Sequence, residues 1–336
     1  MKILGKRIII PFLILLIPYI FILYISIVRT DGEAILTGGL TDVSGFVKID
    51  SDKQEDGSFN SIYVTTYYPT TILQDFILNS SSKNTVADNK ASNHLSREEL
   101  IKMGEISHEA SVDFSLIVAY QEASLIDSFV SLKSSFEGLT IYYYKEGLDF
   151  KVGDIIIAID GVGYTDKENY VKNYQNQDVG TILTILRDGR TFDLVLDSTY
   201  FPQKGYIYYQ TYALYDIDYK NSYPSLSISS SGTSGPSGGL LQSLSIFNHL
   251  TSFDYTLGKK IAGTGTLDID GNVGAIGGIE QKVYTAYENK VDIFFCPYAN
   301  KEEGLKAYNS LKNKERMEFV VVSTFTDAIS YLRNHA

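Results

Sequence analysis

A serine between glycines and a lysine at a helix start are the residues of this chain best suited to carry out chemistry. Ser237 lies in the sequence Gly-Pro-Ser-Gly-Gly at 235–239, and apolar residues follow at helical spacing from Leu240 to Leu250. Unpaired N–H groups at a helix N-terminus can stabilise the oxyanion formed when a serine attacks a carbonyl. Composition alone also allows a flexible Ser/Gly linker over 229–239, but the apolar pattern that follows favours a nucleophile loop.

Lys282 is the candidate general base for this serine. It follows two short strands joined by an Asp-Gly turn at 270–271, and the Gly-Gly pair at 277–278 precedes its helix. A lysine with an ordinary pKa of about 10.4 keeps its proton at neutral pH, so Lys282 must be buried to become neutral. The alternative is a solvated helix lysine, and the nearby serine loop favours the catalytic role.

Together, the two motifs resemble the proteolytic domain of Lon proteases, the S16 class, over residues 205–336. That family pairs a Gly-Pro-Ser-small-Gly loop with a Gly-Gly-x-x-x-Lys helix start, and both occur here in the same order. The resemblance implies an α/β proteolytic domain with a Ser-Lys dyad and no cofactor. The residues that it implies are Ser237 as nucleophile, Lys282 as base, Thr264 as the group orienting the amine, and Gly235, Pro236 and Gly238 as the supporting loop.

A small antiparallel domain is predicted between residues 126 and 200. The alternating strand 155–159 is followed by an Asp-Gly turn at 160–161, and a second Asp-Gly turn at 188–189 closes a hairpin. This order resembles a PDZ domain, although any small domain with two such hairpins would share it. The resemblance implies that a peptide adds as a strand to Phe136, Glu137, Gly138, Leu139, Thr140 and Ile141.

The N-terminal segment is predicted to be a membrane anchor. Residues Ile8 to Val28 carry no formal charge, and at about 1.5 Å per residue a helix of this length crosses a hydrocarbon core of about 30 Å. A cleaved signal peptide is the alternative, but its apolar stretch is usually shorter and ends at a small-residue cleavage site. Lys2, Lys6 and Arg7 precede the span, so the N-terminus is expected in the cytoplasm and the remainder outside the membrane.

Between the anchor and the PDZ-like segment, the chain reads as strands and then helices. An Asp-Gly pair at 56–57 predicts a hairpin between strands near Phe46 and Ile62, and Ser96 with Glu99 predicts a capping box before one or two helices. These early strands are compatible with the Lon-type domain if the PDZ-like domain is inserted into it. The expected fold class is α+β, with a tail at 1–7, a transmembrane helix at 8–28, strands and helices at 31–125, a PDZ β-sandwich-like domain at 126–200 and the Lon-type domain at 201–336.

Composition excludes several other classes of protein. The net charge of -11 disfavours binding to nucleic-acid phosphates, and the single Cys296 cannot form an intramolecular disulfide. The histidines show no zinc-ligand spacing, so no metal is expected. No Gly-x-x-x-x-Gly-Lys-Ser/Thr sequence occurs, so the ATP-binding loop of complete Lon machines is missing.

Anchor, PDZ-like segment and Lon-type segment together resemble the membrane-anchored PDZ-containing Lon-type peptidases of Gram-positive bacteria. The resemblance implies an ATP-independent serine endopeptidase that cleaves exposed extracellular peptides or envelope proteins, a secreted signalling peptide being one candidate. Its expected partners are peptide or unfolded protein substrates and the cell membrane, and an oligomer is left open. The alternative is a catalytically silent PDZ scaffold for envelope proteins.

Overall fold

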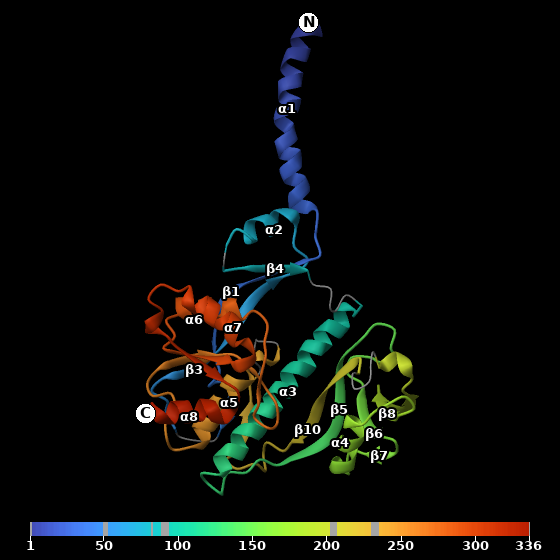
Figure 1. The fold of residues 1–336 in the computed structure, drawn as a ribbon, viewed down its shortest axis with the longest axis vertical. Coiled ribbons are helices and arrows are strands. Elements are labelled where there is room, and N and C mark those ends of the chain that lie inside the picture. Colours follow the sequence, from blue (N-terminus) through green and yellow to red (C-terminus); the bar gives the residue numbers. More distant parts are fainter. Residues whose placement is uncertain are drawn as a thin grey trace.

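The computed structural model describes residues 2–49, 53–81, 83–88, 94–201, 207–229 and 235–335, and the side chains of residues 2–14 are not among those described. Figure 1 shows a helix that projects from a body containing two sheets, with a second long helix running between those sheets. The projecting helix is α1 (Lys2–Ile27), and the helix between the sheets is α3 (Arg97–Ser124). The fold is therefore a mixed α+β arrangement.

The first sheet joins strands from both ends of the chain. Its order is β16-β15-β12-β3-β1-β4, with parallel pairing from β16 to β3 and antiparallel pairing of β1 with β3 and β4. The strands are β1 (Gly32–Asp42), β3 (Ser58–Tyr67), β4 (Thr85–Asp88), β12 (Lys260–Gly263), β15 (Ile293–Pro297) and β16 (Glu318–Val322). Strand β15 is buried at every residue, as expected for a parallel strand covered on both faces.

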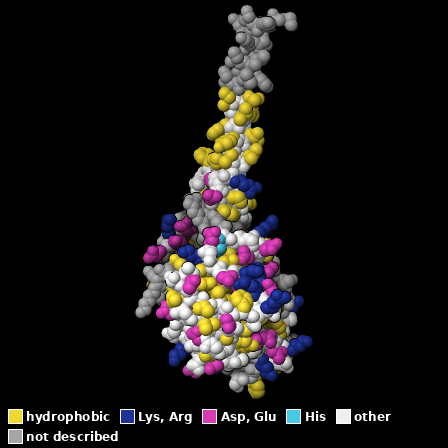
Figure 2. Space-filling view, turned by 90° about the vertical axis from the view of Figure 1, so that its right-hand side faces the viewer, with side chains coloured by type: hydrophobic (Ala, Val, Ile, Leu, Met, Phe, Trp, Pro, Cys, Tyr) yellow, Lys and Arg dark blue, Asp and Glu magenta, His cyan; other side chains and the backbone are white. Residues whose placement is uncertain are grey.

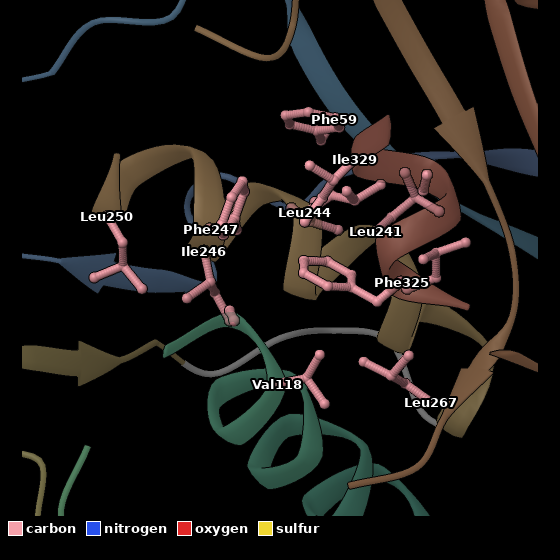
Figure 3. Packing of buried hydrophobic residues seen from close by; sticks show 14 of the residues in the cluster. Phe59, Val118, Leu241, Leu244, Ile246, Phe247, Leu250, Leu267, Phe325 and Ile329 are labelled. Carbon is pink, nitrogen blue, oxygen red and sulfur yellow. The ribbon is translucent and has the colours of Figure 1, made fainter. Parts of the chain in front are cut away.

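Helices cover both faces of this sheet. Neighbouring residues of β15 point to opposite faces: Phe295 joins a core with α3, α5 and α8, and Phe294 joins a second core with α6 and α7. The helices are α5 (Gly239–Leu250), α6 (Ile279–Glu288), α7 (Lys301–Asn309) and α8 (Phe325–Asn334). In the first core, Leu244 of α5 lies close to Ile329 of α8 (Figure 3).

The second sheet belongs to a segment that begins after α3 and ends before β11 (Leu226–Ile228). We call residues 134–217 the insert. Its sheet has the order β10-β5-β6-β8-β9, with β7 paired to β6, and its own buried core. The elements are β5 (Ser134–Tyr144), β6 (Ile155–Ile159), β7 (Val162–Gly163), α4 (Lys167–Gln175), β8 (Ile182–Arg187), β9 (Arg190–Val195) and β10 (Tyr209–Ile217).

Both predicted Asp-Gly turns of the insert join paired strands. Asp160 and Gly161 have φ angles of 50° and 78° between β6 and β7, and Asp188 and Gly189 have 49° and 74° between β8 and β9. Two successive residues with positive φ match the right-handed twist of a tight hairpin, and Asp-Gly pairs tolerate that conformation. The boundary predicted at residue 200, however, separates β10 from the sheet that it completes.

Two local predictions fail because strands pair with distant partners. The expected hairpin around residues 56–57 does not form: β2 (Val47–Ile49) pairs with β11 (Leu226–Ile228), while β3 lies between β1 and β12. The predicted peptide-binding edge at 136–141 also needs correction. Strand β10 pairs with β5 along its length, and β6 pairs with β5 at Leu139 and Thr140, so this edge is already occupied.

Helix α3 is a single continuous helix of 28 residues. The predicted capping box is present at its start, where the Ser96 side chain accepts from the Glu99 N–H and the Glu99 carboxylate accepts from the Ser96 N–H. Small residues such as Ser115 and Ala119 are fully buried, which lets α3 approach α5 closely. The helix therefore contacts α5 beside the first sheet on one side and strands β5 and β10 of the insert on the other (Figure 1).

The N-terminal helix carries apolar side chains around its circumference between residues 15 and 27, and Figure 2 shows them exposed. Within the part of the chain that the structure describes, however, no helix has both the length and the apolar character needed to cross a membrane. The span predicted from Ile8 begins among residues 2–14, whose side chains lie outside that part. Helix α2 (Ile72–Leu78) lies beside the base of α1 (Figure 1).

Candidate active site

The loop that holds Ser237 is shaped by glycines. A short 3₁₀ turn, Pro236–Gly238, leads directly into α5. Gly235 has φ of 103°, a conformation that a residue with a side chain rarely adopts. A side chain at Gly238 would come within 2.9 Å of the Ser61 hydroxyl oxygen, so the loop also lies tightly against β3.

Lys282 enters the site from the first turn of α6. That helix begins after Gly278, which has φ of 68° and turns the chain into it, and the Lys282 N–H makes a helical bond to the Gly278 carbonyl. The lysine is only 3% exposed, although its side chain ends in an amine. Its Nζ lies 2.9 Å from Ser237 Oγ. The structure thus brings together the two residues predicted to form the dyad.

Thr264 completes a three-residue network. It is fully buried just after β12, and its Oγ1 lies 2.9 Å from Lys282 Nζ. The same hydroxyl donates to the backbone carbonyl of Ser237 at 3.0 Å. Because the threonine proton is used on that carbonyl, Oγ1 is left to accept an N–H from the amine. A neutral amine held in this way can direct its lone pair at Ser237 Oγ.

Burial gives the Lys282 amine the chemistry that a base needs. Removal from water lowers its pKa from 10.5 to about 8, because a low-dielectric environment disfavours the charged form. About a tenth of the amines are then neutral at pH 7. An ordinary surface lysine would be protonated almost completely, so the burial of Lys282 is what makes proton transfer from Ser237 accessible near neutral pH.

The turn ahead of α5 also provides hydrogen-bond donors. The Ser237 and Gly238 N–H groups lie at the helix start, where helix geometry offers them no intrahelical acceptor. The helix dipole adds partial positive charge at this end. These groups are suited to stabilise negative charge on a carbonyl oxygen attacked by Ser237.

Helix α3 supports the nucleophile loop through residues that the sequence analysis did not identify. The His108 ring lies beside the Gly235 backbone and interacts with it, and Ser111 Oγ donates to the Pro236 carbonyl at 3.2 Å. One turn further, Ser115 Oγ shares its proton between the carbonyls of Ser111 and Gly239, at 2.6 and 3.0 Å. The positions 108, 111 and 115 lie on one face of a helix, which is the only signal that the sequence carries for them.

The residues predicted to bind peptide lie in β5 of the insert and not with the dyad. Phe136 packs against the rings of Tyr170 and Tyr215. Thr140 is 8% exposed, and its hydroxyl has no hydrogen-bond partner within the described part of the chain. The structure therefore places these residues in the insert's packing and at its boundary with α3.

Comparison with known proteins identifies the C-terminal part of the chain. Residues 227–333 match the family model described as the Lon protease (S16) C-terminal proteolytic domain. A Lon protease of Campylobacter jejuni is 33% identical over 97 residues, and a Lon protease of Mesomycoplasma hyopneumoniae is 30% identical over 98 residues. Each match covers 29% of this chain but only 12% and 11% of those relatives.

The matched segment contains Ser237, Thr264 and Lys282, together with α5, α6 and the strands that hold them. The family predicted from the two motifs is confirmed for this segment. Residues 227–333 are therefore a Lon-type proteolytic domain of the S16 class, and the chain carries the domain of a Lon-type serine peptidase.

Proposed function

We propose that this protein is an ATP-independent serine endopeptidase, anchored to the cell membrane by its N-terminal helix, that cleaves accessible peptides outside the cytoplasm. The observation that carries the proposal is the buried Lys282 amine at 2.9 Å from Ser237 Oγ. A buried lysine is costly to a fold unless its neutral form is used. Here the amine faces a hydroxyl at the start of a helix, which is the arrangement that acyl transfer requires.

In the proposed reaction, Ser237 Oγ attacks the carbonyl carbon of the scissile bond while its proton passes to neutral Lys282. The backbone N–H groups ahead of α5 stabilise the negative charge that develops on the carbonyl oxygen. The Lys282 ammonium then gives its proton to the departing amine, leaving an acyl group on Ser237. Water deprotonated by the same amine releases the acyl group and restores the dyad. Thr264 positions Nζ throughout.

The anchor and the location are supported by the N-terminal sequence and the shape of α1. The uncharged run from Ile8 follows basic residues, and α1 projects away from the body as one helix (Figure 1). The insert is proposed to be PDZ-like, supported by its strand order, its single helix α4 and its two Asp-Gly turns. With no ATP-binding sequence in the chain, the proposed substrates are peptides, unfolded segments and exposed tails of envelope proteins.

The experiment compares the full chain with dyad variants in lipid nanodiscs, using quenched fluorescent peptides and an unfolded protein. Ser237→Ala and Lys282→Met are expected to abolish cleavage. Lys306→Met, at an α7 lysine with 80% side-chain exposure, is the matched control and is expected to keep full activity. Equal cleavage by all four proteins contradicts the dyad. Absence of cleavage by the wild-type protein, with retained binding of envelope proteins, favours the scaffold alternative.

Location is tested separately on intact cells. A protease added from outside is expected to digest the region after α1, because the basic N-terminal tail should remain in the cytoplasm. Protection of the C-terminal region in sealed cells, with digestion after lysis, contradicts the proposed orientation.

A further inference from the structure

A cavity of about 650 Å³ lies between α3 and the insert. Its walls come from one face of α3, from β5 and β10, and from the end of β11. Much of the lining is apolar, as in ligand pockets of this size generally. The apolar wall of the cavity includes Phe46, Ile106, Val112, Ile155 and Leu214.

One wall of the cavity carries three carboxylates. Glu109 and Asp113 stand one turn apart on α3, and Asp216 faces them from β10. Burial and repulsion from the other two raise the pKa of Asp113 to about 7. Burial is the main cause that raises the pKa of Tyr219, and the same three carboxylates raise it further, so all three lie near this side of the cavity. The geometry therefore concentrates negative charge at one end of an apolar space.

The other polar groups of the lining do not neutralise this wall. The Lys102 amine lies against the backbone of Gly153, where a side chain would clash with it. His108 has a pKa lowered by burial, which favours its uncharged form. The Thr140 hydroxyl is buried and has no hydrogen-bond partner within the described residues. The carboxylates and the Thr140 hydroxyl can therefore accept hydrogen bonds from the N–H groups of a bound cation.

The cavity is close to the nucleophile loop. His108 lines it and interacts with the backbone of Gly235, two residues before Ser237. Residues two apart point to opposite sides of a helix, so Glu109 and Asp113 lie away from Ser111, and His108 lies between the two sides of α3. The path proposed for a substrate side chain therefore runs from Ser237 past His108 to the carboxylates.

We propose that this cavity binds the basic side chain, lysine or arginine, of the peptide substrate, an inference that rests on the proposed peptidase function. The aliphatic stem of such a side chain packs on the apolar wall, and its cationic end bonds to the carboxylates. A shared metal ion is not the occupant, because no group of three acidic, histidine or cysteine side chains among the described residues is arranged to hold one.

The test uses the full chain in nanodiscs and pairs of peptides that differ only by lysine or glutamine at successive positions around one scissile bond. Wild-type protein is expected to prefer lysine at one position by about tenfold in kcat/KM, as expected for a charge-assisted hydrogen bond to the half-buried Asp113. Asp113→Asn and Asp216→Asn are expected to remove that preference by lowering kcat/KM for the lysine peptide more than for the glutamine peptide. Glu105→Gln, at an exposed residue of α3 outside the cavity, is the matched control.

Binding to Ser237→Ala protein separates failure of this inference from failure of the peptidase. Cleavage without any lysine preference, or a preference that survives both carboxylate substitutions, overturns the inference and leaves the peptidase intact. Absence of cleavage with tighter binding of the lysine peptide contradicts the peptidase and supports the cavity. Absence of cleavage with equal binding of both peptides overturns both.

Discussion

Replacing Lys282 with methionine is expected to destroy activity and yet stabilise the catalytic domain at pH 7. Lowering the Lys282 pKa from 10.5 to about 8 corresponds to a cost of about 3 kcal/mol for keeping the protonated amine in the folded state. Methionine has a similar length and carries no charge, so that cost disappears. The hydrogen bonds to Ser237 and Thr264 are lost as well, at about 1 kcal/mol each. The net expected gain is about 1 kcal/mol.

The sign of this effect depends on pH. The folded-state pKa of Lys282 lies below the unfolded one, so between about pH 8 and 10.5 the unfolded chain binds more protons and stability rises with pH. The full cost applies below pH 8 and vanishes above 10.5. Relative to wild type, Lys282→Met should therefore lose about 3 kcal/mol between pH 7 and 10.5 and become the less stable protein.

Cys296 provides the assay. Its thiol is fully buried in β15, in the same core as Val283 of α6, and it is the chain's single cysteine. Labelling of this thiol in increasing denaturant, corrected for the reactivity of an unfolded peptide, gives the free energy of opening this domain. Lys306→Met serves as the control for removing an exposed positive charge. A stability difference between Lys282→Met and wild type that is constant from pH 7 to 10.5 would refute the reasoning.

Three further outcomes are expected. The rate at which a fluorophosphonate labels Ser237, measured as a function of pH, should rise about tenfold per pH unit below pH 8 and level off above it. A rate that keeps rising to pH 10 contradicts the lowered pKa of Lys282. Ser111→Ala should slow that labelling by about tenfold through one lost hydrogen bond to the loop and should leave KM for the peptide substrate unchanged. Ser124→Ala, at a half-buried position at the far end of the same helix, should not slow it. The preference for the lysine peptide over the glutamine peptide should weaken as pH falls through about 7, because Asp113 then becomes neutral. Both peptides are cleaved by the same dyad, so the ratio of their kcat/KM values reports on Asp113 and not on Lys282.

The dyad could be predicted from sequence because each of its motifs is local. Ser237 lies in a glycine-rich turn directly before an apolar helix, and Lys282 lies in the first turn of the helix that follows the Gly-Gly pair. Each arrangement can be recognised from a few neighbouring residues. Likewise the Asp-Gly turns of the insert and the capping box at Ser96 depend on a few neighbouring residues. A role as general base requires that Lys282 be buried, and this could be predicted from the sequence. How completely the side chain is buried could be learned only from the structure.

Partners distant in sequence could not be predicted. The alternating pattern of 58–67 shows that β3 is a strand, but not that β1 and β12 flank it. The tyrosine-rich segment 209–217 fits any sheet, and only its pairing with β5 assigns it to the insert. No sequence motif identifies His108, because its place beside Gly235 depends on how α3 packs against the nucleophile loop.

The pairing of β5 with β10 has a consequence for how this architecture could arise and change. The insert leaves at Ser134 and returns at Ile217, and these two residues are neighbours in the same ladder. A segment attached by one two-stranded stem can be gained, exchanged or lost in a single genetic event without altering the order of the six-stranded sheet. Selection can thus vary what surrounds the cavity on the insert's side while the dyad keeps its place.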